Sequence, residues 1–444
     1  CRRCAATPLR QMPRHGGGWT TIAHFSARPL HKSLPVLDVQ AITANGLCAG
    51  CGMCAGVGDR ARPAIVMRNS SEGYRRPVVV GTVPPEQARL IDAACPGANI
   101  RHDPASHEAD YHPIWGPLIA ARLGWSADAE LRRNASSGGG LSAMLVHLLN
   151  SGQIDYVVQT AVSADSPLRN ALAISTGRDD VFRAAGSRYA PSSPLEDIAA
   201  RLDGPGRFAF VGKPCDVAGL RQLARHDPRV DAKVPFMFAF MCAGVPSYRG
   251  TSALLKAMGV EDESAVTAFR FRGDGWPGFA TAELADGRRF AMDYDTSWGT
   301  ILNRHLQFRC KICPDGIGEF ADIVCADGWH LDEAGRPLFD ERDGRSLVLT
   351  RTRKGEALVA EAMTAGMLLT EPVEVTAIAR MQPFQAKRKG LVISRLTAMA
   401  LTGRKRPRYT GLALGRNARM LGAKENLRSL LGTLRRLVAA KGAD

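Results

Sequence analysis

Three cysteines stand at a two-residue spacing in Cys48-Ala-Gly-Cys51-Gly-Met-Cys54, and a fourth precedes proline at Cys95-Pro96. Thiolates at this spacing can bind three irons of an iron–sulfur cube, and a cysteine followed by proline closes the bacterial ferredoxin pattern. The neighbouring glycines let backbone N–H groups approach the sulfurs. A zinc site with four donors around one ion and ordinary buried thiols are the alternatives. We predict a [4Fe–4S] cluster on Cys48, Cys51, Cys54 and Cys95, and a role in electron transfer.

Four further cysteines fall where an α/β sheet binds ligands. Cys215 begins the helix of a predicted strand–turn–helix–strand unit (207–241), and Cys242 follows its second strand. Both therefore lie at the carboxyl edge of parallel strands. With Cys310-Lys-Ile-Cys313 they can form a second four-thiolate site. The alternative is that Cys215 and Cys242 are core residues, while Cys310 and Cys313 hold zinc with other partners.

A turn rich in serine and glycine precedes a predicted amphipathic helix (141–149). It consists of Ser136, Ser137, Gly138 and Gly139. Hydroxyls, first-turn N–H groups and the helix dipole together favour an anion, and a phosphate group is the ligand we expect. The alternative is a simple helix cap, because the chain has neither a Gly-x-Gly-x-x-Gly fingerprint nor a Walker loop.

The spacing of apolar residues predicts the elements that hold these motifs. Strands are expected at 64–67, 77–80, 154–160, 207–211, 234–241, 267–274, 279–284, 288–292 and 322–326, and helices at 85–94, 141–149 and 216–225. Cys325, inside one of these strands, is predicted to be a buried core thiol. The fold class is therefore mixed α/β (α+β): a small ferredoxin-like module, a mixed α/β domain and a basic helical tail. We place the boundaries at 1–37, 38–112, 113–386 and 387–444.

The net charge of +15 is concentrated at the two ends of the chain. Residues 387–444 contain fifteen Lys/Arg against two acidic residues, and residues 1–37 contain six Lys/Arg and no acidic residue. The remainder is mildly acidic, so we predict no nucleic-acid partner. No apolar run reaches the ~18 residues of a membrane helix, and we expect a cytoplasmic protein.

The two basic ends have different interpretations. Residues 1–37 have a composition typical of a transit peptide, of a disordered lead-in or of an upstream region included in error, and the last two are favoured. Their Cys1 and Cys4 receive no metal assignment. In the tail, an apolar stripe of leucines (427–438) is flanked by arginines. This helix can dock on an acidic partner or on an anionic membrane surface, or pack one face on the body.

Read together, these motifs resemble the coenzyme F420 hydrogenase/dehydrogenase β-subunit family of iron–sulfur flavoproteins. The resemblance covers roughly residues 45 to 350, in the family's order. It is carried by the Cys48–Cys54 segment, Ser136–Gly139, Gly186-Ser-Arg-Tyr189, Gly212-Lys-Pro-Cys215, Phe240–Ser247, Phe269-Arg-Phe-Arg-Gly273 and Arg309-Cys-Lys-Ile-Cys-Pro-Asp315 with Ala321-Asp322. One departure is Val324-Cys-Ala-Asp327, where the family tends to have Gly-Asp.

The resemblance implies bound FAD and one or two [4Fe–4S] clusters. Ser136, Ser137, Gly138 and Gly139 would lie along the FAD phosphates, with Ser187, Arg188 and Lys213 nearby. The two sets of four cysteines would hold two clusters. Weak candidates for a proton donor are His305, Asp327 and Tyr189, so the catalytic residue stays unknown.

The resemblance also suggests two electron carriers. The run Arg270 to Gly278 is closest to the branch that reduces chlorophyll precursors, so we expect a ferredoxin-like donor, clusters, FAD and a conjugated organic substrate. The alternative is an F420-dependent oxidoreductase, or an electron-transfer β subunit of a hydrogenase or dehydrogenase complex. Arg270 and Arg272 would then bind the anionic tail of F420.

Overall fold

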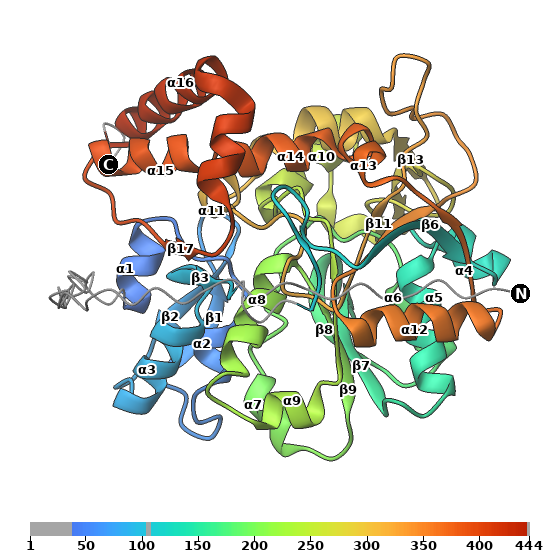
Figure 1. Ribbon diagram of the computed structural model, residues 1–444, viewed down its shortest axis with the longest axis horizontal. Helices are drawn as coiled ribbons and strands as arrows, with labels where there is room; N and C mark the ends of the chain where they lie inside the picture. Colours follow the sequence, from blue (N-terminus) through green and yellow to red (C-terminus); the bar gives the residue numbers. More distant parts are fainter. Residues whose placement is uncertain (1–37, 104–107, 442–444) are drawn as a thin grey trace, which may run out of the picture. The chain divides into compact units, whose positions relative to one another are not determined.

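The computed structural model describes residues 38–103 and 108–441, which belong to one compact unit (Figure 1). The segment 1–37, with Cys1 and Cys4, lies outside the described residues. The two domain boundaries predicted within 38–444, at 112/113 and 386/387, remain a prediction.

An eight-stranded mixed sheet forms the centre of the fold, in the order β16-β6-β15-β14-β10-β9-β7-β8. The neighbours β7, β9, β10 and β14 are parallel, and the remaining pairs are antiparallel. The parallel strands place their carboxyl ends at one edge. The strands are β6 (Ala120–Ser126), β7 (Tyr156–Ser163), β8 (Ser166–Ser175), β9 (Phe208–Gly212), β10 (Phe236–Phe240), β14 (Ile323–Asp327), β15 (Ser346–Thr350) and β16 (Leu368–Pro372).

The central strands are buried on both faces. Phe208 and Phe210 of β9 pack into one core cluster, and Ala209 and Val211 pack into the other. This alternation follows the two-residue period of a strand, and double burial explains the continuous apolar sequence. Three helices supply much of the two cores: α8 (Pro214–Leu223) on one face, and α5 (Gly140–Asn150) and α12 (Arg353–Thr364) on the other.

The N-terminal part is a small module of short elements. It contains α1 (Val39–Ala44), α2 (Met53–Gly56), β1 (Ile65–Asn69), β2 (Arg75–Val79), α3 (Pro85–Ala94) and β3 (Asn99–Arg101). Strands β1 and β2 pair antiparallel, as the two predicted strands require. Between Val80 and Pro85 the chain enters α3, which begins at the proline because the fixed φ of proline suits the first helical position.

A separate three-stranded antiparallel sheet is formed by the segment between β10 and β14. Strands β11 (Val266–Arg270), β12 (Ala280–Leu284) and β13 (Arg289–Met292) pack with α10 (Tyr248–Met258) in a separate core cluster. An irregular π-helical turn, Asp295–Ile301, follows them. Sequence periodicity did not predict this turn.

The basic tail is helical and packs on the module and the cysteine loops (Figure 1). It comprises α14 (Pro383–Gly390), α15 (Val392–Leu401), β17 (Arg408–Thr410) and α16 (Leu414–Lys441), which is kinked at Gly422. Strand β17 pairs parallel with β3, so the tail extends the N-terminal module. The mixed α/β class and the helical tail are thus confirmed. Within the described residues, no helix is both long enough and apolar enough to cross a membrane.

Candidate redox site

The four cysteines of the N-terminal module surround one small cavity. Cys48, Cys51, Cys54 and Cys95 all line it, and we call them the first quartet. The N–H group of Gly50 points at the Cys48 sulfur at 3.3 Å. Burial, with a further contribution from the Cys48 thiol, raises the pKa of Cys95 to about 11. The first quartet therefore joins four thiols and a backbone donor, which is the donor set of an iron–sulfur cluster.

Two glycines let the backbone fold around the first quartet. Gly50 and Gly52 both adopt positive φ angles, 75° and 86°. A Cβ atom at Gly52 would lie 2.7 Å from the backbone nitrogen of Glu196. Only glycine fits this turn, because other residues would be strained and would collide with the backbone of the main domain.

The remaining four predicted ligands also come together, and we call them the second quartet. Cys215 lies in the first turn of α8, Cys242 follows β10, and Cys310 and Cys313 lie at α11 (Phe308–Lys311). Burial raises the pKa of Cys242 to about 12, and Cys310 and Cys313 contribute. Burial also raises the pKa of Cys215, with contributions from Cys242 and Cys313. The four thiols are thus close enough to affect one another's ionisation.

The spacing of the thiols bears on the zinc alternative. Within residues 38–103 and 108–441, no three His, Cys, Asp or Glu side chains are grouped closely enough to hold a single metal ion. Zinc draws four donors to about 2.0–2.3 Å from one ion. The thiolates of a cube each bind a different iron and lie further apart. Which of the two metal groups each quartet binds stays a prediction.

Helix α8 connects the surroundings of the two quartets, because it carries Cys215 of the second and packs against residues next to the first. A Cβ atom at Gly219 of α8 would lie 3.4 Å both from Met53, within the first cysteine segment, and from Pro96. After burial, the Asp216 carboxylate contributes to the raised pKa of Cys51 in the first quartet and of Cys215 in the second. Asp216 of α8 therefore lies within electrostatic reach of a thiol of each quartet.

A cavity of about 250 Å³ opens at the carboxyl edge of the parallel strands. It joins the predicted phosphate turn to the second quartet, because Cys242 and the serines of the turn share its wall. Most of the predicted cofactor residues lie in this wall. The lining includes Ser136, Ser137, Gly139, Ser187, Arg188, Tyr189, Lys213, Cys242, Arg272, Trp298, Cys325 and Asp327.

The serine–glycine turn is built by close backbone packing. Gly138 and Gly139 both have φ angles of 71°, and α5 begins at Gly140. A Cβ atom at Gly138 would lie 2.5 Å from the carbonyl oxygen of Gly344, so only glycine fits. Gly138 itself is outside the cavity lining. It holds the turn so that the start of α5 faces the cavity.

A buried ion pair closes one end of the cavity. The guanidinium of Arg272, which is 2% exposed, donates to Asp327 at 2.7 and 2.9 Å. Trp276 Nε1 and Ser137 Oγ also donate to this carboxylate, each at 3.1 Å. Asp327 is therefore an acceptor in the cavity wall that links the loop 270–278 to the serine turn.

Lys213 forms a second buried ion pair beside Cys215. Its ammonium lies 2.7 Å from Asp216 and donates to Ser192 Oγ at 3.1 Å. Burial disfavours the charged ammonium, but Asp216 and the Cys215 thiol raise the pKa of Lys213 above its ordinary value. Lys213 and Asp216 therefore place a buried ion pair at the point where the cavity meets the second quartet.

Three predicted site residues form hydrogen bonds to other groups of the protein. Arg270 is outside the lining and donates to the carbonyl and side-chain oxygens of Asn134, at 3.0 and 2.8 Å. His305 is also outside the lining, and its carbonyl accepts from Tyr74 at 2.7 Å. Arg188 lies in the wall, but four of its donors bond to Asn170 and to backbone carbonyls. Of the three proton-donor candidates, Tyr189 and Asp327 face the cavity and His305 does not.

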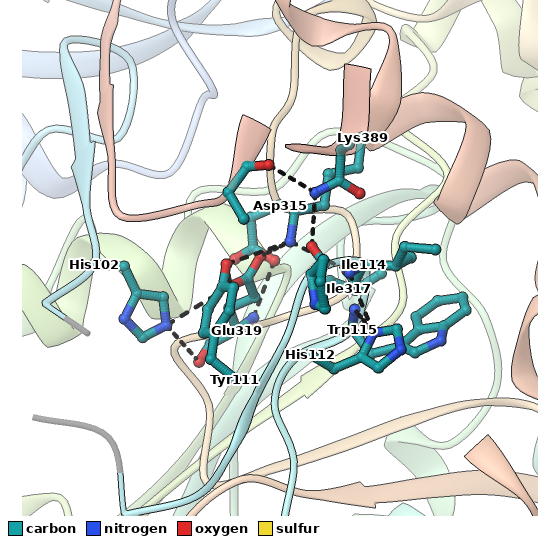
Figure 2. Close-up of polar contacts among 12 residues, drawn as sticks. His102, Tyr111, His112, Ile114, Trp115, Asp315, Ile317, Glu319 and Lys389 are labelled. Carbon is teal, nitrogen blue, oxygen red and sulfur yellow. Dashed lines mark hydrogen bonds and ion pairs between the residues drawn. The ribbon is translucent and has the colours of Figure 1, made fainter. Parts of the chain in front are cut away.

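A buried polar network lies behind the loop that carries Cys313 (Figure 2). The carboxylate of Glu319 accepts from Lys389 Nζ at 2.6 Å and from the Tyr111 hydroxyl at 2.7 Å. Asp315 accepts from the Glu319 N–H at 3.0 Å. Burial, followed by the charge of Glu319, raises the pKa of Asp315 to about 6. Through Lys389 the network ties the tail to the residues that follow Cys313.

Comparison with known proteins agrees with this architecture. The family model for the N-terminal part of the coenzyme F420 hydrogenase/dehydrogenase beta subunit matches residues 121–199, and that for its C terminus matches residues 206–376. The chain belongs to this family. The second quartet and the cavity lie inside the matched ranges. The first quartet and the tail from 387 onward lie outside them.

The relatives found are F420-linked proteins. The beta subunit of coenzyme F420 hydrogenase from Methanococcus voltae is 27% identical over 265 residues, 58% of this chain and 84% of that protein. The coenzyme F420-dependent sulfite reductase of Methanocaldococcus jannaschii is 25% identical over 56% of this chain and 38% of that protein. A chain of the F420-reducing [NiFe] hydrogenase complex from Methanosarcina barkeri has the same fold, with a TM-score of 0.52 and 21% identity over 67% of this chain and 98% of its own length.

Sequence reasoning missed several residues of the site. Asp216 and Arg309 stand next to cysteines in the sequence, so their position was a signal that we did not use. Trp298 lies on the irregular turn at 295–301, where no periodic pattern points to it. Arg388 and Lys389 belong to the tail, and nothing in their local sequence indicates contact with the cysteine loops.

Proposed function

We propose that this chain is the iron–sulfur and flavin-binding subunit of an F420-linked oxidoreductase, which exchanges electrons between F420 and a redox partner protein. The observation that carries the proposal is the shared cavity wall: Cys242 of the second quartet and the Ser136–Gly139 turn line one cavity. The F420-linked relatives support this alternative better than a ferredoxin-dependent reductase of a chlorophyll precursor.

The donor sets support the assignment of each group. The first and second quartets each offer four buried or half-buried thiols to a [4Fe–4S] cluster. The Ser136–Gly139 turn and the start of α5 offer hydroxyl and N–H donors to the phosphates of FAD. Tyr189 and Trp298, with ring centroids 4.6 Å apart, offer an aromatic wall to a flat ring system.

A bound flavin supplies the exchange between two-electron hydride transfer and single-electron transfer. The protein orients the reactants and sets the local charge. The Lys213–Asp216 ion pair lies beside Cys215, at the junction of the cavity and the second quartet. Arg270 and Arg272 direct their guanidinium groups to Asn134 and Asp327, so we assign neither to the F420 tail: Arg272 belongs to the cavity wall, and Arg270 lies outside it.

The test is anaerobic purification followed by iron, sulfide and flavin quantitation. We expect about eight irons per chain, as two [4Fe–4S] clusters require, together with one flavin. Reduced F420 should then bleach the flavin, and reduced ferredoxin should not. Absence of iron and flavin would contradict the proposal. Flavin bleaching by reduced ferredoxin but not by reduced F420 would instead support a ferredoxin-dependent reductase.

A further inference from the structure

The three most deeply buried arginines of the described chain differ in how their charge is balanced. Arg272 forms an ion pair with Asp327, and Arg351 lies within electrostatic reach of Glu319. Arg309 is only 2% exposed, yet it has no carboxylate partner within residues 38–103 and 108–441. Burying an uncompensated charge costs several kcal/mol. The position of Arg309 therefore needs an anion that is not a carboxylate.

The contacts of Arg309 satisfy only part of its guanidinium. Nη2 donates to the carbonyl oxygen of Pro96 at 2.9 Å. The guanidinium lies 5.5 Å from the ring centroid of Tyr409, which is a weak cation–π contact. Nε is buried and has no hydrogen-bond partner among the described residues. The side chain is thus held in place without neutralisation.

Arg309 stands between the two quartets. Its bonded carbonyl belongs to Pro96, which follows Cys95 of the first quartet, and Arg309 itself precedes Cys310 of the second. The guanidinium is therefore bonded to the backbone next to Cys95, while its own residue is directly followed by Cys310, so it lies beside a ligand of each quartet.

We propose that Arg309 is the shared counter-cation of the two cysteine quartets and favours the reduced state of the cluster at each. This inference rests on the proposed function, because it requires a cluster at both quartets. A cluster held by four thiolates is anionic, and reduction adds one electron and one further negative charge. The nearby guanidinium stabilises that added charge. No bond forms or breaks at Arg309, and its proton stays in place.

The experiment is a potentiometric titration of the anaerobically purified protein, followed by electron paramagnetic resonance. In Arg309→Gln the equilibrium constant for reduction should fall about tenfold at both clusters, which is a downward shift of about 59 mV for a one-electron couple. Arg309→Lys keeps the charge and should leave both potentials near those of the wild type.

Two matched variants locate the effect. Arg388 donates to the carbonyl of Cys242 at 2.9 Å, so Arg388→Gln should lower the potential of the second cluster alone. Lys424 is exposed on α16, and Lys424→Gln should shift neither. Unchanged potentials in Arg309→Gln, or a shift at one cluster only, would overturn the proposal.

Iron and sulfide quantitation separates failure of this inference from failure of the proposed function. A wild-type protein without clusters contradicts the proposed function itself. If Arg309→Gln loses iron while Arg309→Lys retains it, the requirement for charge is supported. If both variants lose iron, the guanidinium acts only by binding Pro96 and Tyr409, and the counter-cation role is wrong.

Discussion

The first and second quartets each consist of four cysteine thiols, but the charged residues around them differ. The cavity of the first is otherwise lined by apolar and glycine residues such as Val39, Ile42 and Met67. Near the second, the charge of Lys213 beside Cys215 is balanced by Asp216, whereas Arg388, which has no carboxylate partner among the described residues, donates to the carbonyl of Cys242. Arg309 contacts the edge of both.

This contrast teaches that the ligand set alone does not determine what each quartet does. Cluster potentials depend on nearby charge, hydrogen bonds and exposure. Positive charge around the second quartet favours the reduced state of a cluster bound there. We therefore expect the first cluster to have the lower potential, so that electrons pass from the first quartet to the second and on to the cavity.

The largest effect is expected when one cysteine of either quartet is replaced. Cys54→Ala and Cys310→Ala should each lose about four of about eight irons, because each cube depends on its own four thiolates. Iron quantitation of the two purified variants measures this. Loss of all iron from either variant would show that the quartets do not load independently.

A smaller effect is expected at the ion pair that distinguishes the second quartet. Lys213→Met leaves the completely buried Asp216 without its partner, which should lower the free energy of unfolding by about 3–5 kcal/mol. Urea denaturation measures the loss. The double variant Lys213→Met with Asp216→Leu should recover most of it. No recovery would mean that the lysine acts by packing rather than by pairing.

The tail offers a matched pair of leucines. Leu437 is buried in the cluster that contains Cys48 and Ile312, whereas Leu431 is 57% exposed on the same helix. Leu437→Ala should lower the free energy of unfolding by about 2–4 kcal/mol, because it leaves a cavity beside the quartets. Leu431→Ala should change it by about 0.5 kcal/mol or less. Equal effects in thermal denaturation would contradict one-sided packing of α16.

The smallest effect is expected at the surface of the first quartet. Arg75 pairs with Glu196 at 2.5 Å, and both side chains are partly exposed. Burial raises the pKa of Glu196 despite the pairing. Arg75→Met should therefore cost about 0.5 kcal/mol in urea denaturation, which is typical of a solvent-screened pair. A decrease of several kcal/mol in the free energy of unfolding would show that this ion pair behaves like the buried Lys213–Asp216 pair.

Local sequence patterns predicted much of the fold. The strand–turn–helix–strand unit at 207–241 appears as β9, α8 and β10, with Cys215 and Cys242 at the expected ends. The helix 85–94 has the predicted bounds, because proline begins it. These elements are decided by short-range periodicity and by proline, and both are visible in a single sequence.

Long-range contacts were not visible in the same way. In the sequence, Arg270 and Arg272 are similar cations of one loop. In the structure, Arg270 donates to Asn134, whereas Arg272 forms an ion pair with Asp327. Nothing local indicated that Lys389 would meet Glu319, or that β17 would pair with β3. Such partners are chosen by tertiary packing, which here brings together residues that are between 55 and 309 positions apart.

The covering of both quartets by the tail has a consequence for how the protein matures. The last ligand, Cys313, precedes α14, and α16 reaches the packing around Cys48 and Ile312 only after 100 further residues are made. A ribosome exposes the N-terminal segments first. Iron can therefore enter both quartets before the tail docks. Once Arg388, Lys389 and Leu437 are in place, the tail would have to move away before iron bound at either quartet could be replaced.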